Sequence, residues 1–287
     1  MSGSTSQTRF FSEPSGESVE IETSGRTIRP LMALPTVLVD EAKLRFDAGG
    51  LHTTAVDPAN VGMVGINAKP AAFEGYHVDG ADDVLIGVNL TRLKSSLSDA
   101  RLGKSTDDPV ELDIDATRTL VSIDREYDVT TLSRTDELLN IEPESIRQEP
   151  DIPNLDLSYR AELDVDAFCD AVDYIPTDYV EIGEFDGHLI LKGDPNGDEM
   201  TRSTRIDVGD VAEPITETPT ENASSIYSMD YLRDMAKGLK KAKVTSLSVR
   251  WGQEFPLMLD FERCDDETVL YEGRYMLAPR IQSGGDA

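Results

Sequence analysis

Apolar residues recur at helical spacing in the segment from Met229 to Lys243. They are three or four positions apart, so a helix gathers them into one stripe that faces a core: Met229, Leu232, Met235, Ala236 and Leu239. Ser228 is a typical N-cap, and Asp230 suits the positive end of a helix. The basic residues lie away from this stripe: Arg233, Lys237, Lys240 and Lys241. The pattern predicts an amphipathic helix that presents cations outward.

Most other apolar residues alternate with polar ones in short runs, which is typical of strands with one buried face. Gly49-Gly50 and Asp186-Gly187 separate such runs and are hairpin signals. Two further helical stripes stand out. One begins at Asn89, with Gly103 near its end, and the other covers Asp164 to Asp173.

The order strand, helix, strands, helix, strands occurs twice. The linker from Ile141 to Ser158 separates the copies, and its three prolines and weak periodicity predict an extended segment. The sequence therefore predicts an α+β protein of two duplicated domains, each an antiparallel sheet with two helices on one face. The expected bounds are 1–16 for a flexible tail, 17–140 for domain 1, 141–158 for the connector, 159–282 for domain 2 and 283–287 for a C-terminal tail.

The charge of the chain narrows the choice of partners. It has 55 acidic residues and 27 basic ones, which gives a formal net charge of -28, and the acidic residues are distributed along the whole length of the 287-residue chain. Such a charge normally opposes nucleic-acid binding, because the phosphate backbone is repelled. An alternative is adaptation to a salty cytoplasm, where screening shortens the Debye length to about 3 Å at 1 M salt. We hypothesise a halophilic source, which predicts that the protein unfolds when salt is removed.

Several kinds of site are excluded by residue types and spacing. Two cysteines are too few for a disulfide framework, the three histidines are isolated, and no glycine-rich phosphate loop occurs. We therefore expect no catalytic residues, no metal and no cofactor. Paired carboxylates such as Asp82-Asp83 and Asp265-Asp266 leave open a metal-dependent hydrolase. The absence of a signal peptide and of a membrane-spanning run predicts a cytoplasmic location.

Basic residues gather on the two helices that the duplication makes equivalent, those after Asn89 and after Ser228. Without interleaved aromatic residues, they suit sequence-independent contacts to phosphates. The alternative is an ordinary solvated helix face. The residues predicted to contact DNA are Arg92, Lys94, Arg101, Lys104, Arg233, Lys237, Lys240 and Lys241.

Three motifs resemble the DNA sliding-clamp family (proliferating cell nuclear antigen) in its haloarchaeal form. They are Ala55-Val-Asp-Pro-Ala-Asn-Val-Gly-Met-Val64, Ser145-Ile-Arg-Gln-Glu-Pro-Asp-Ile-Pro153 and Tyr275-Met-Leu-Ala-Pro-Arg-Ile281. The resemblance implies a ring of three subunits around duplex DNA, with helices lining the hole. It implies a processivity factor that tethers polymerases and repair enzymes, is loaded by an ATP-using clamp loader and does no chemistry itself.

The resemblance also implies a pocket for a partner peptide that carries a glutamine and aromatic plugs. For Val56 and Val61, ordinary core packing is the alternative. The pocket residues carried over are Val56, Asn60, Val61, Met63, Ile152, Pro256, Met276, Leu277, Ala278 and Pro279.

Subunits of such a ring meet through edge strands, here Tyr127 to Ser133 of one copy and Arg202 to Val208 of the next. Asp128 is expected to face Arg202 or Arg205. The contact residues are Tyr127, Val129, Thr131, Ser133, Arg202, Thr204, Ile206 and Val208. The acidic helix from Asp164 to Asp173 departs from the family pattern, and a clamp-fold platform that is never loaded on DNA remains the alternative function.

Overall fold

The computed structural model describes residues 17–80, 83–101, 107–147, 155, 157–186, 188–193, 202–206, 213–214 and 223–280. Its first half contains β1 Ser18–Ser24, α1 Gly25–Ala33, β2 Glu41–Asp47, β3 Gly50–Val56, β4 Gly62–Ala68, β5 Gly75–Asp79, β6 Val84–Asn89, α2 Leu90–Leu97, β7 Pro109–Asp115, β8 Arg118–Glu126 and β9 Thr131–Leu139. Its second half contains β10 Tyr159–Leu163, α3 Val165–Tyr174, β11 Tyr179–Phe185, β12 His188–Gly193, β13 Ser203–Ile206, β14 Glu213–Pro214, β15 Ser224–Ser228, α4 Met229–Lys241, β16 Ser246–Trp251, β17 Leu257–Asp265 and β18 Thr268–Leu277. Short 3₁₀ turns lie at Pro35–Val37, Pro70–Ala72 and Pro143–Ser145.

The two halves have the same strand order, which confirms the predicted duplication. The order β5-β1-β7-β8-β9 in the first half corresponds to β14-β10-β16-β17-β18 in the second. The order β4-β3-β2-β6 likewise corresponds to β13-β12-β11-β15. All pairings are antiparallel, and the two predicted hairpins form where Asp47 pairs with Gly50 and Phe185 with His188.

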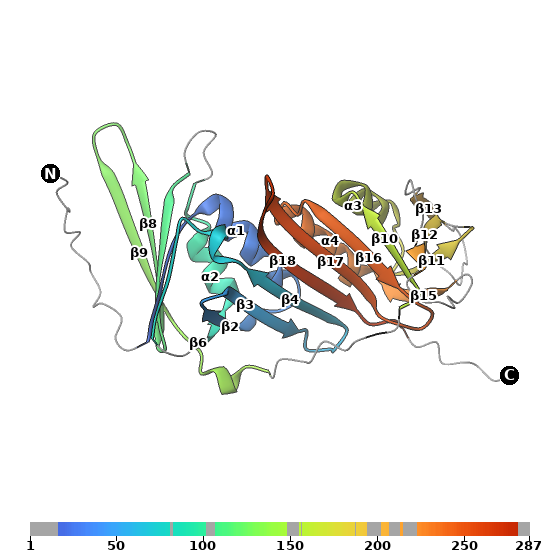
Figure 1. The fold of residues 1–287 in the computed structure, drawn as a ribbon, viewed down its shortest axis with the longest axis horizontal. Helices are drawn as coiled ribbons and strands as arrows, with labels where there is room; N and C mark the ends of the chain where they lie inside the picture. The colour runs from blue at the N-terminus through green and yellow to red at the C-terminus, as the bar shows by residue number, and fades with distance from the viewer. Residues whose placement is uncertain are drawn as a thin grey trace.

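The halves are joined by one strand pair that the sequence did not predict. β18 pairs with β4, with Tyr275 opposite Val64 and Leu277 opposite Gly62, so strands of both halves form a continuous nine-stranded sheet. The strands at the corresponding positions, β9 and β13, are the outermost strands of their sheets. They lie at opposite ends of the elongated molecule (Figure 1).

The helices pack in pairs and meet at the junction of the halves. α1 packs on α2, α3 packs on α4, and α1 also contacts α4. At the junction the buried Tyr275 hydroxyl donates to the carbonyl of Leu34 at 2.6 Å. A Cβ at Gly238 of α4 would lie 2.5 Å from that hydroxyl oxygen, so the close approach of helix and sheet requires glycine here.

Two predicted elements differ in the structure. α2 ends at Leu97, not near Gly103, because Ser98 and Asp99 favour a helix end: the Ser98 hydroxyl donates to the carbonyl of Ser95 at 2.6 Å. The predicted strand from Tyr127 to Ser133 is wrong in its first half. Tyr127 to Thr130 form the turn between β8 and β9, closed by a 2.8 Å hydrogen bond from the Tyr127 N–H to the Thr130 carbonyl.

Within the described residues, no helix is long and apolar enough to cross a membrane. The same residues hold no group of three or more His, Cys, Asp or Glu side chains arranged to bind a metal ion.

Candidate functional site

A buried polar side chain with several hydrogen bonds lies in the loop between β3 and β4. Asp57 is only 2% exposed, and its carboxylate accepts hydrogen bonds from three backbone N–H groups: those of Ala59 at 2.8 Å, Val61 at 2.7 Å and Gly62 at 2.7 Å. The loop therefore wraps around its own carboxylate, as an Asx-type turn does. This holds the start of β4 in place beside the end of β18.

A helix of the other half supplies a further hydrogen-bond donor to Asp57. The hydroxyl of Tyr231 in α4 donates to its carboxylate at 2.6 Å. Burial by itself raises the pKa of Asp57, but the bonds from Tyr231 and the loop N–H groups outweigh burial and lower the pKa below 3.8. The carboxylate thus stabilises the fold above its ordinary pKa, and this contribution is lost as the pH falls through the lower folded value. The same bond raises the pKa of Tyr231 to about 12.

Two more segments converge on this loop. Arg147, just after β9 and its 3₁₀ turn, donates to the carbonyl of Asp57 at 2.8 Å and to the Asn60 side-chain oxygen at 2.5 Å. The N–H of Ala278, just after β18, donates to the carbonyl of Val61 at 2.8 Å. The β3–β4 loop, α4, the segment after β9 and the C-terminal segment therefore meet at one place, which we call the Asp57 hub.

Several described residues predicted for the partner pocket lie at the Asp57 hub, where Asn60, Val61 and Ala278 take part in its hydrogen bonds. Val56 pairs with Met63, and Met63 pairs with Met276 across the junction. Met63 and Leu277 are buried, as residues of the core are. Asn60 is exposed and has a positive φ of 58°. The residues that are partly exposed are Val56, Val61, Pro256, Met276, Ala278 and Pro279. Ile152 lies outside the described residues, and the peptide contact of the whole set stays a prediction.

Sequence reasoning missed Asp57, Arg147 and the hydroxyl of Tyr231 as members of this site. The signal for Asp57 was present, since Asp-Pro-Ala-Asn between two strands is a turn in which Asp accepts backbone N–H groups. No local pattern reveals that Arg147 and Tyr231, 90 and 174 positions away, are its partners.

The basic residues of α4 do not all point to solvent. Arg233 is partly buried, with 24% of its side chain exposed, and donates to the carbonyls of Ile175 at 2.6 Å and Thr177 at 3.2 Å. It thus ties α4 to the segment after α3, contrary to the predicted outward orientation. Lys240 and Lys241 are exposed, and Lys237 is exposed beside Asp234 at 3.1 Å.

The basic residues after Asn89 are also divided. Arg92 and Lys94 are exposed on α2. Arg101 lies beyond the end of the helix, where it pairs with Asp108 at 3.3 Å and lies 5.4 Å from the ring centre of Tyr127. Lys104 is outside the described residues. The DNA contacts of these residues stay predictions. Of the four, Arg92 and Lys94 are the two that lie exposed on a described helix.

An acidic surface adjoins the basic one. α3 packs directly on α4, where the Cys169 thiol donates to the carbonyl of Ala236 at 3.4 Å. The exposed residues of α3 include Asp166, Asp170 and Asp173. The predicted helix over Asp164 to Asp173 is confirmed by α3, and its acidic residues lie on the helix that packs against the basic α4.

Among the described strands, none pairs with the outer edge of β9, and this edge has a well-defined polarity. The turn bond at Tyr127 and a bond from the Asn140 N–H to the Thr117 carbonyl at 2.8 Å set which residues exchange hydrogen bonds with β8. In the antiparallel register, the N–H and carbonyl groups of residues 131, 133, 135, 137 and 139 then point away from β8. Such a row of unpaired groups is a template for another strand.

The predicted contact residues are distributed over this edge and the opposite one. Tyr127 and Val129 lie in the β8–β9 turn, and Val129 is 92% exposed. Thr131 and Ser133 lie on β9, and Thr204 and Ile206 lie on β13. Arg202 precedes β13, 5.3 Å from the ring centre of Tyr174, and Val208 lies outside the described residues. The subunit contact stays a prediction.

Comparison with known proteins gives a consistent group of relatives. No protein-family model matches the chain. It is 38% identical over 272 residues to a protein of Natronomonas pharaonis described as DNA polymerase sliding clamp, covering 91% of the chain and 97% of the relative. It is also 38% identical over 274 residues to one of Haloarcula marismortui with the same description, covering 91% and 97%.

Solved structures agree in fold. A structure described as the C-terminal region of FEN-1 bound to A. fulgidus PCNA matches with a TM-score of 0.74 and 27% identity, over 92% of this chain and 99% of that one. PCNA from Thermococcus kodakaraensis matches with a TM-score of 0.74 and 24% identity, over 91% and 100%, which shows the fold alone.

Proposed function

The chain belongs to the DNA polymerase sliding clamp family, and from this premise we propose that three copies close into a ring around duplex DNA. The ring tethers a DNA polymerase and other enzymes that carry a clamp-binding peptide, including repair enzymes, and a clamp loader opens it. It acts as a processivity factor in the cytoplasm, without catalysis, metal or cofactor. The proposed domains are residues 17–140 and 159–282, with 141–158 as the connector between them.

The observation that carries the ring is the strand pair inside the chain. β18 and β4 are the duplicated counterparts of β9 and β13, and they pair antiparallel at the junction of the halves. A neighbouring copy can therefore place its β13 on β9 by the same geometry. The two edges lie at opposite ends of the molecule, as a head-to-tail ring requires (Figure 1).

The internal junction also supplies a register for the contact between copies. Inside the chain, Tyr271 pairs with Ala68 and Glu272 pairs with Asn67. The duplication replaces Tyr271 by Leu132 and Ala68 by Ile206, so Leu132 is expected opposite Ile206 of the next copy. In the same way Ser133 is expected opposite Arg205 of the next copy. Continuing along the strands, Asp136 faces Arg202. This replaces the pair expected for Asp128, which lies in the β8–β9 turn.

The experiment that tests the function is loading on closed circular DNA. We expect the protein, with its clamp loader and ATP, to stay on the circle and to be released when a nuclease linearises it. Retention on circular DNA alone indicates a ring threaded on the DNA, since a protein held by direct contacts stays on both circular and linear DNA. A clamp-fold platform that is not loaded on DNA would show no such release, and that result would contradict the proposal.

Exposed lysines of α4 are proposed to adjust sliding rather than to hold the ring on DNA. Changing Lys237, Lys240 and Lys241 together to alanine is expected to leave the trimer intact and to reduce polymerase stimulation severalfold at low salt. The reason is that phosphate contacts lose strength steeply as salt rises, whereas threading does not. Primer extension at several salt concentrations measures this, with Lys243→Ala as the matched control beyond the helix. Unchanged stimulation at the lowest salt that keeps the ring folded would contradict this role.

The Asp57 hub is proposed as the frame of the partner-peptide pocket. It joins the β3–β4 loop, the segment after β18 and Arg147 of the connector, and the pocket residues Asn60, Val61 and Ala278 take part in its hydrogen bonds. Partly exposed apolar residues on such a frame suit aromatic anchor residues of a partner.

A further inference from the structure

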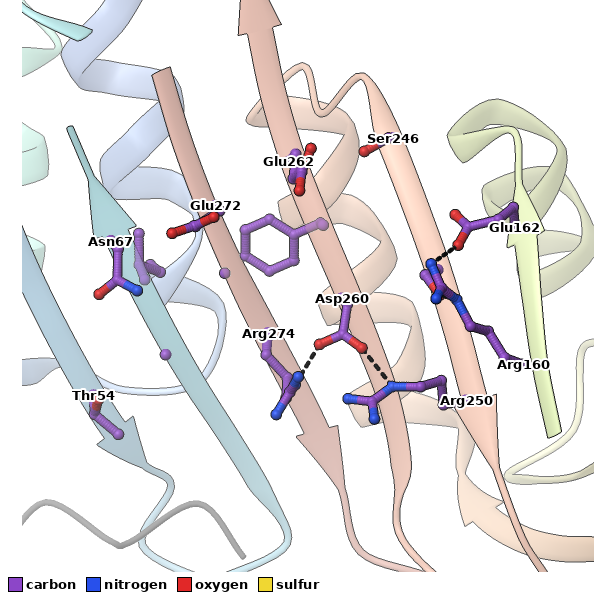
Figure 2. A pocket seen from close by; sticks show the side chains of 15 residues that line it. Thr54, Asn67, Arg160, Glu162, Ser246, Arg250, Asp260, Glu262, Glu272 and Arg274 are labelled. Atoms are coloured by element: carbon purple, nitrogen blue, oxygen red, sulfur yellow. Dashed lines mark hydrogen bonds and ion pairs between the residues drawn. The ribbon is translucent and has the colours of Figure 1, made fainter. Parts of the chain in front are cut away.

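A groove of about 880 Å³ lies on the face of the nine-stranded sheet opposite the helices, across β10, β16, β17, β18 and β4 (Figure 2). On its floor two arginines converge on one carboxylate. Arg250 donates through Nε to Asp260 at 2.6 Å, and Arg274 donates through Nε to the other oxygen of the same carboxylate. We call Arg250, Asp260 and Arg274 the arginine pair site.

This site has an excess of positive charge and unused donors. Arg250 and Arg274 share a single negative charge, and their side chains are only 23% and 33% exposed. Among the described residues, Arg250 has beyond Asp260 only the weak acceptor Met258 Sδ at 3.4 Å, and none accepts from the terminal nitrogens of Arg274. Partly buried guanidinium groups with free donors favour an oxyanion, which they bind by charge-assisted hydrogen bonds.

Neighbouring charges do not supply that oxyanion. Arg160 pairs with Glu162 at the rim of the groove, and Lys69 pairs with Glu272 at 2.7 Å. Glu262 lies one step further along β17, opposite Glu272, on the side away from the methionines described below.

The site adjoins the proposed peptide pocket. Side chains on a strand alternate between faces, so Met258 and Met276 share the face of Asp260 and Arg274, two positions and about 7 Å away. Met258 pairs with Met276, and Met276 pairs with Met63. Met258 and Met63 are buried and Met276 is partly exposed, and the three make a row of methionines from the arginine pair site to the Asp57 hub. A peptide anchored at the hub could reach the arginines with a residue two to four positions from its anchor, at about 3.3 Å per residue.

We propose that the arginine pair site binds an Asp or Glu side chain that flanks the anchor motif of a partner peptide. This inference rests on the proposed peptide pocket. In a chain of net charge -28, a local positive site selects acidic partner segments that the rest of the surface repels.

The test compares two synthetic peptides by calorimetry on the whole ring at one salt concentration. Both carry the glutamine and the aromatic plugs, but one has Asp and Glu in its flank where the other has Asn and Gln. We expect the acidic peptide to bind about fivefold more tightly, the gain expected for a partly exposed charge-assisted pair. The double variant Arg250→Gln, Arg274→Gln should lose this preference and keep the affinity for the neutral peptide, whereas the rim variant Arg160→Gln should keep both.

The possible failures are distinguishable. Equal affinity of the two peptides for the unchanged ring, or a preference that survives in the double variant, overturns this inference alone. Failure of both peptides to bind overturns the peptide pocket and this inference with it. A short DNA duplex whose binding is lost in the double variant would assign the arginines to phosphate and would also overturn the inference.

Discussion

Replacing Ser133 with proline is expected to convert the ring into monomers of 31.5 kDa while each monomer stays folded. The N–H of Ser133 points away from β8, so proline removes a donor from the free edge without removing one from the β8–β9 ladder. The proline ring also blocks the approach of the neighbouring strand, as proline does on natural sheet edges. Because retention depends on closure, tethering on circular DNA should be lost altogether.

Light scattering and circular dichroism at one salt concentration measure the two effects separately. Ser133→Ala is the matched control, since it removes the hydroxyl and keeps the N–H, and it should remain trimeric. The pairing predicted for Asp136 with Arg202 is checked by reversing both charges together. A trimer that survives Ser133→Pro would show that β9 is not the strand through which copies meet.

Replacing Asp57 with alanine is expected to lower the free energy of unfolding by about 3 kcal/mol, because it leaves buried donors without an acceptor. The loss includes three N–H groups of the β3–β4 loop and the hydroxyl of Tyr231. Since the loop frames the proposed pocket, the affinity for the neutral partner peptide should fall at least about tenfold, the factor given by 1.4 kcal/mol of lost preorganisation. Denaturant unfolding and calorimetry measure the two losses.

Tyr231→Phe is the matched control for this prediction. It removes a single hydrogen bond and leaves the loop N–H groups satisfied, so the expected loss is about 1 kcal/mol. If Asp57→Ala binds the peptide as tightly as the unchanged protein, the Asp57 hub has no part in the pocket and serves folding alone.

The helices and hairpins were predictable because their signals are local. The apolar stripe of α4 and the turn at Asp186 depend on residues a few positions apart, although the Ser228 side chain makes no capping hydrogen bond. β9 was displaced because it is an exposed edge strand: its residues from Thr131 to Glu137 are mostly polar and carry no alternation of buried positions.

The orientations of the basic residues were not predictable in the same way. A helical wheel places Arg233 on the same side as Lys237, but a long side chain turns toward acceptors when the tertiary structure offers them. The carbonyls of Ile175 and Thr177 come from a segment that no pattern in α4 identifies. The same holds for Arg101, whose partner Asp108 lies just before β7 and not on α2.

Periodicity, turn residues and motifs depend only on the order of residues along the chain, so they were sufficient to predict most elements, their duplication and the family, but not the end of α2 or the start of β9. Tertiary structure decided which strand pairs with which across the halves, and therefore which edges remain free for another copy. It also decided that Asp57, Arg147, Tyr231 and Ala278 meet at one hub, and that Arg250 and Arg274 share Asp260. These are contacts between distant segments, and their geometry is set by how the sheets and helices pack rather than by local preference.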